Sequence, residues 1–175
     1  MEEGRITLVA KDGEKVVTDP RIKEFSVLIK NIVEDSGIQE EIPLVSVSKS
    51  ILDKIIEYCQ HHSYIVPPPI KKPIPTDKIE DAVSDPWDAE FINGFEEDPL
   101  IDLTLASNYM DIKCVLDLCC GKIASMFKGK TIDELRQKYG ITEEFTAEEE
   151  ERLKKEYPWA LEGDEERLLQ ARNAS

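Results

Sequence analysis

The fold of this chain is decided by the stretch Asn108-Tyr-Met-Asp-Ile-Lys-Cys-Val-Leu-Asp-Leu-Cys-Cys-Gly-Lys-Ile-Ala-Ser-Met-Phe-Lys-Gly-Lys-Thr131. At about 100° per residue, its second half places Val115, Cys119 and Met126 on one helical stripe. Further apolar residues widen this stripe to an arc of roughly 240°, although a one-sided surface helix needs only about 100°. These residues are Leu116, Cys120, Ile123, Ala124 and Phe127. The surplus apolar surface predicts burial by another part of the chain or by another protein.

The composition restricts the class of partner. The chain has 175 residues, with 37 acidic and 22 basic side chains and a net charge of -15. This charge repels phosphate backbones and anionic membranes, so we expect no nucleic-acid or membrane partner. A basic leader and a long apolar run are both missing, which predicts a cytoplasmic and nuclear protein. The four cysteines are typical of reduced thiols rather than a disulfide framework.

The first part of the chain combines short strands with helices. Alternation at residues 6–10 and 15–18, separated by Asp12-Gly13, predicts a β-hairpin, and residues 42–47 predict a third strand. Asp19-Pro20 and the periodic residues 26–35 predict two small helices between the strands. A longer helix is expected after Ser48, ending at two histidines.

Residues 63–84 break the helical pattern with a proline tract and predict a mobile loop. After this loop, Asp85-Pro86 and Asp98-Pro99 each predict a helix start with a capping aspartate and a first-turn proline. Thr131-Ile-Asp-Glu134 and Thr146-Ala-Glu-Glu149 match the capping box of a helix N-terminus. Two such short, charged helices cannot form a core alone, so we expect them to dock on the preceding helix or on a partner.

Cys59-Gln-His-His62 is a Cys/His cluster with metal-like spacing. A zinc site would need further ligands from Cys114 or Cys119-Cys120, and a thiol enzyme would use the same residues. The simpler interpretation is that Cys59 packs in the core while the histidines end a helix. Nucleotide-binding, serine-hydrolase and zinc-protease motifs are absent from the sequence, and we expect no catalytic residue, metal or cofactor.

Several motifs occur in one order along the chain. They are Pro43-Leu44, Cys59-x-His-His62, Pro67-Pro-Pro69, Trp87-Asp-x-Glu-Phe91, Asn108-Tyr-Met-Asp-Ile-Lys113, Lys128-Gly-Lys-Thr131, Phe145-Thr-x-Glu-Glu-Glu150 and Trp159. In this order the chain resembles the S-phase-kinase-associated adaptor family of SCF ubiquitin ligases. The resemblance extends from about Ile6 to Trp159.

The resemblance implies an α/β fold, namely a BTB/POZ-like domain with a small three-stranded sheet, surrounding helices and two additional C-terminal helices. On this basis we assign residues 1–128 to the BTB/POZ-like domain, 129–160 to a two-helix F-box-binding extension and 161–175 to an acidic C-terminal tail. The implied function is a nonenzymatic adaptor. It bridges F-box proteins to the N-terminal region of a cullin scaffold, and so acts indirectly with a RING subunit and an E2.

By position, the resemblance assigns cullin binding to Asn108, Tyr109 and Met110. It assigns F-box binding to seven residues, which are Leu116, Cys120, Ile123, Phe127, Ile141, Phe145 and Trp159. Three features depart from the family pattern: Ile132 replaces a usual proline, Lys71 and Lys72 replace an acidic run, and residues 162–175 prolong the chain. The alternatives are an elongin-C-like adaptor, a Cys/His zinc or thiol enzyme, and a freestanding self-associating BTB protein. Weak homodimerisation of the free adaptor is also expected.

Overall fold

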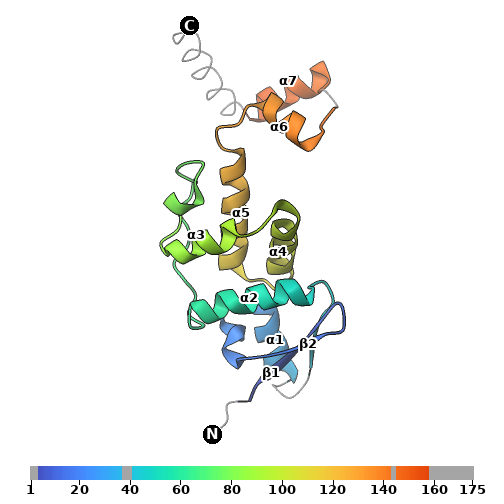
Figure 1. Cartoon of the computed structure of the whole chain (residues 1–175). Coiled ribbons are helices and arrows are strands. Elements are labelled where there is room, and N and C mark those ends of the chain that lie inside the picture. The colour runs from blue at the N-terminus through green and yellow to red at the C-terminus, as the bar shows by residue number, and fades with distance from the viewer. Residues whose placement is uncertain (1–3, 37–40, 143–144, 158–175) are drawn as a thin grey trace. The chain divides into compact units, whose positions relative to one another are not determined.

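The computed structural model describes residues 4–36, 41–142 and 145–157 (Figure 1). The chain divides into two units, residues 1–130 and 131–175, and each is described by itself. The sequence predicted the boundary between the BTB/POZ-like domain and its extension after residue 128, two residues before this division. Trp159 and the tail 161–175 lie outside the described residues.

A small sheet opens the first unit, and its strand order is β2-β1-β3. Strand β1 (Ile6–Ala10) pairs antiparallel with β2 (Lys15–Thr18) and parallel with β3 (Ile42–Leu44). Gly13 turns the hairpin with a φ of 81°, a left-handed conformation that glycine adopts without strain. The predicted hairpin and third strand are thus confirmed, although β3 is shorter than residues 42–47.

Helices surround the sheet, which confirms the predicted α/β class. The crossover from β2 to β3 contains the 3₁₀ helix η1 (Pro20–Glu24) and helix α1 (Val27–Ser36). Helix α2 (Lys49–His61) contacts both β2 and α4 (Glu97–Tyr109), and Figure 1 shows it between the sheet and α4. The remaining elements of this unit are η2 (Ile79–Asp81), α3 (Pro86–Asn93), α4 (Glu97–Tyr109) and α5 (Lys113–Phe127).

One apolar core joins these elements. Ile29 of α1, Leu52 of α2, Leu103 of α4 and Leu118 of α5 are all fully buried within it. Helix α4 begins two residues before the predicted start at Pro99, because this proline occupies its first turn rather than its first position. None of the described helices is long and apolar enough to cross a bilayer.

The second unit contains α6 (Ile132–Tyr139) and α7 (Ala147–Glu156). Both predicted capping boxes are confirmed: the hydroxyls of Thr131 and Thr146 accept from the backbone N–H of Glu134 and Glu149, whose carboxylates accept in return. Helix α6 has no buried residue, so these caps supply much of the local order.

Candidate partner-binding surfaces

One face of α5 combines apolar composition with exposure. Leu116, Cys120, Ile123 and Phe127 recur at helical spacing and therefore share this face, which we call the α5 face. Cys120 is exposed, and Phe127 is 40% exposed. Leu116 and Ile123 are half-buried, and Ile123 also packs against the core at the edge of the face. The structure thus brings four of the predicted F-box residues together on an open apolar strip.

Another side of α5 is covered by the chain itself. A Cβ added at Gly121 would lie 2.7 Å from Ile70 Cδ1, and Ile74 and Ile79 are also close. Polar contacts flank this packing, since Lys72 Nζ lies 2.7 Å from Asp117 Oδ1 and Lys128 Nζ donates to the carbonyl of Ile74. The segment 63–84 therefore accounts for part of the wide apolar arc.

This packing qualifies the expectation for residues 63–84. Their mobility stays a prediction, but part of the segment is anchored, because Ile79 and Ala82 belong to the core. The backbone N–H of Lys71 donates to the carbonyl of Ala82 and closes the segment on itself. What remains open on α5 is the α5 face, together with the exposed Ala124 beside it.

Two further predicted F-box residues lie in the second unit. Ile141 follows α6 and is exposed, and Phe145 precedes α7 with 56% of its surface exposed. The guanidinium of Arg136 lies 5.8 Å from the centre of the Phe145 ring, within range of a cation–π contact. Whether these two residues join the α5 face in one surface stays a prediction.

The predicted cullin residues lie where α4 ends. Asn108 is exposed, and Tyr109 is half-buried against the core. The residues at the start of α1 hold the end of α4 in place. Ser26 Oγ donates to the carbonyl of Met110 at 2.6 Å, and Val27 N donates to the carbonyl of Asp111. Asp111 has a φ of 51°, which turns the chain sharply into α5.

Met110 requires a correction. It was assigned to cullin contact by its position in the motif, but its side chain is 0% exposed. A side chain with no accessible surface cannot touch a partner in this conformation. The Met110 side chain instead packs in the core, and its backbone carbonyl accepts a hydrogen bond from the Ser26 hydroxyl.

Two exposed apolar residues on the same side of α4 as Asn108 were not predicted from the sequence. Ile101 and Leu105 of α4 are 50% and 61% exposed, and their spacing of four and then three residues to Asn108 places all three on one side of the helix. We call Ile101, Leu105 and Asn108 the α4 strip. The sequence did carry a signal, because Leu100, Ile101, Leu103 and Leu105 are too many apolar residues for one helical face.

Three of the four cysteine thiols are placed unfavourably for nucleophilic catalysis. Cys59 and Cys119 are buried, and burial raises the pKa of both; that of Cys119 reaches about 12. Burial also raises the pKa of Cys114 to about 11. Since the thiolate is the nucleophilic form, these three residues are poor nucleophiles near pH 7.

Comparison with known proteins decides the family. Residues 4–64 match the tetramerisation domain of the Skp1 family, and residues 113–160 match its dimerisation domain. This chain belongs to the Skp1 family. Within that family, the S-phase kinase-associated protein 1 homolog of Tetrahymena thermophila is 42% identical over 164 residues, which span 93% of this chain and 98% of the relative.

Two fungal members of the Skp1 family show similar agreement. The E3 ubiquitin ligase complex SCF subunit sconC of Arthroderma benhamiae is 38% identical over 90% of this chain and 96% of its own length. The suppressor of kinetochore protein 1 of Schizosaccharomyces pombe is 38% identical over 89% of this chain and 97% of its own length. The resemblance inferred from the sequence motifs is thereby confirmed, and the elongin-C-like alternative is not favoured.

Proposed function

We propose that this Skp1-family chain is the adaptor subunit of an SCF-type E3 ubiquitin ligase and bridges F-box substrate receptors to a cullin scaffold. The observation that carries the proposal is the presence of two exposed apolar surfaces, the α5 face and the α4 strip, on different helices of one folded unit. An adaptor needs two such surfaces, because it must hold two partners at once. The name of the sconC relative, an SCF subunit, supports the same assignment.

The α5 face is the proposed F-box surface. Burying apolar surface contributes about 25 cal/mol per Å², so a partner that covers Leu116, Ile123 and Phe127 gains binding energy without relying on charge. The second unit would add Ile141, Phe145 and Trp159. Because its helices have little core of their own, we expect part of their order to come from the partner.

The α4 strip and Tyr109 form the proposed cullin surface. Asn108 offers an amide that can both donate and accept, and Leu105 offers exposed apolar area next to it. Since the core holds α4 against α5, the adaptor fixes the distance between its two partners. Ubiquitin transfer would then occur on other subunits, with the RING subunit and E2 joined through the cullin.

We further propose that the chain is nonenzymatic and acts in the cytoplasm and nucleus. The buried thiols with raised pKa values support the first point, because a thiol enzyme needs a thiolate near pH 7. Weak homodimerisation of the free chain remains part of the proposal, since an uncovered α5 face favours self-association.

Reconstitution tests this function. The full chain is mixed with an F-box protein and a cullin N-terminal region from the same organism, and the products are measured by size-exclusion chromatography with light scattering. We expect a complex with one copy of each protein, and no complex of F-box protein with cullin when the chain is omitted. Binding of a SOCS-type box in preference to the F-box would instead support the elongin-C-like alternative, and absence of the three-protein complex would contradict the proposal.

A further inference from the structure

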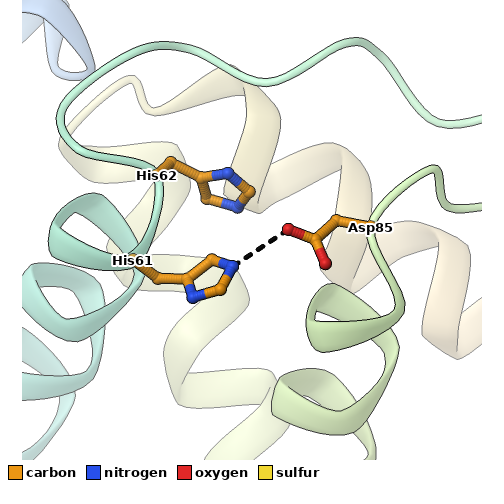
Figure 2. Close-up of side chains that lie close together, drawn as sticks. All are labelled: His61, His62 and Asp85. Atoms are coloured by element: carbon orange, nitrogen blue, oxygen red, sulfur yellow. Dashed lines mark hydrogen bonds and ion pairs between the residues drawn. The ribbon is translucent and has the colours of Figure 1, made fainter.

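A cluster of two histidines and two aspartates lies at the junction of α2 and α3, and it contains no residue assigned to either partner-binding surface. Figure 2 shows His61, the last residue of α2, and His62, which caps that helix, with their rings directed toward Asp85. One ligand atom from each of these three residues lies within 4.8 Å of the others. His61 Nε2 is 2.9 Å from Asp85 Oδ2, and His62 Nε2 is 2.7 Å from Asp88 Oδ1.

We propose that His61, His62 and Asp85 bind a divalent transition metal of the Zn²⁺ type. Imidazole nitrogen and carboxylate oxygen are typical zinc ligands, at about 2.0–2.2 Å from the metal. Tetrahedral ligand atoms at such distances lie about 3.3–3.6 Å apart. The His61 and Asp85 donors are 2.9 Å apart and all three donors lie within 4.8 Å of one another, so the cluster is close to that spacing.

The surrounding side chains hold the three donors in place. The His61 ring stacks on the Trp87 indole, with 3.8 Å between ring centres and 7° between planes. The His62 ring packs against Tyr58 with its centre 4.6 Å away. Asp85 Oδ1 accepts from the backbone N–H of Trp87 and so caps α3, which leaves its second oxygen directed at His61. Such preorganisation reduces the entropy lost when a ligand set closes on an ion.

The solvent exposure of the cluster and the charge of its aspartates are both compatible with a bound cation. The side chains of His61 and Asp85 are 32% and 41% exposed, so an ion can enter from solvent. His62 and Asp88 form the buried side of the cluster, with 9% and 8% of their side chains exposed. Asp88 places a second carboxylate next to the site, so that two negative charges face one divalent cation. With three protein donors, the remaining position is open to water.

The simpler interpretation is a pair of His–Asp hydrogen bonds that join the two helices. Coordination differs from it chemically, because a ring nitrogen that binds metal must give up its proton to the other ring nitrogen or to solvent. Coordination would also tie the end of α2 to the start of α3 and close the base of segment 63–84. The site does not depend on the proposed adaptor function.

The test uses the full chain without a histidine tag, stripped of metal with a chelator and titrated with Zn²⁺ in a calorimeter. Co²⁺ absorption in the visible range reports tetrahedral coordination independently. We expect one metal per chain, at least tenfold weaker binding in His61→Ala and in Asp85→Asn, and a Zn²⁺-dependent rise in melting temperature that both variants lose. Asp85→Asn keeps a side-chain oxygen that can cap α3.

Cys120→Ser is the matched control, because Cys120 is exposed and could bind zinc by itself. It should leave the affinity unchanged. Circular dichroism checks that each variant is folded, and His61→Gln replaces His61→Ala if helicity is lost. The proposal is overturned if the wild-type chain shows no heat with Zn²⁺ and no Co²⁺ band, if the histidine and aspartate variants bind as tightly as wild type, or if Cys120→Ser abolishes binding.

Discussion

Asn108 and Met110 are two positions apart, yet their side chains have opposite surroundings. The exposed Asn108 faces solvent, while Met110 is fully buried beneath the turn at Asp111. A sequence motif gives the order of residues but not the direction of their side chains, and residues two positions apart on a helix point about 200° away from each other. The partner-contact assignment therefore holds for Asn108 as a prediction, whereas Met110 is a packing residue.

Met110→Ala should destabilise the first unit by about 2–5 kcal/mol, because truncation of a buried methionine leaves a cavity. Asn108→Ala is the control, and should change the unfolding free energy by less than about 0.5 kcal/mol. Urea denaturation measures both. A Met110→Ala variant as stable as Asn108→Ala would show that Met110 is not part of the core.

The cysteines offer a second prediction at this scale. At pH 8, iodoacetamide should modify Cys120 first, since it is exposed on the α5 face, while Cys59, Cys114 and Cys119 react far more slowly. The raised pKa values, about 11 for Cys114 and about 12 for Cys119, leave little thiolate at this pH; that fraction grows about tenfold per pH unit while the fold persists.

Mass spectrometry of the labelled peptides identifies the modified residue, and Cys120→Ser should remove the fast reaction. A bound F-box protein should protect Cys120. If Cys120 reacts equally fast in the complex, the α5 face is not the F-box surface.

Individual elements differ in how far the sequence predicts them. The β1–β2 hairpin and both capping boxes were predicted because their signals lie within a few residues of each other. The packing of Ile70, Ile74 and Ile79 on α5 was not predicted, since the prolines between them remove any periodicity. The His61–Asp85 pair was also missed, because its two members lie 24 residues apart.

Gly121 provides the test of this packing. Gly121→Leu should destabilise the first unit by about 1–3 kcal/mol, because the new side chain would overlap Ile70 and force segment 63–84 away from α5. Ala124→Leu places the same side chain at an exposed position of the same helix and should be close to neutral. Thermal unfolding compares the two variants. Equal stability would mean that segment 63–84 does not pack on α5 in solution.

At the scale of the whole molecule, the family and fold were predictable because several motifs occur in one order. The apolar surplus of α4 could be read from the sequence, but only the folded chain shows that Ile101 and Leu105 are exposed and that Met110 is buried.

The division into two units gives a further prediction. A chain that ends at Lys130 should keep the cooperative unfolding of the first unit, because its core lies entirely within residues 4–130.

The same truncation should weaken F-box binding at least tenfold, since it removes Ile141, Phe145 and Trp159. Calorimetric titration of the full and shortened chains with one F-box protein measures the difference. An unchanged affinity would contradict the role assigned to the second unit.

The central claim is that two separate surfaces bind two different partners. Its most direct test is calorimetric titration of two double variants with both partners: Leu105→Lys with Asn108→Lys, and Cys120→Glu with Phe127→Glu. Tyr109 is left intact because it packs partly against the core. We predict that the first variant loses at least tenfold affinity for the cullin N-terminal region and none for the F-box protein, and that the second variant shows the reverse. If either variant weakens both partners equally while remaining folded, or weakens neither, the two-surface account is contradicted.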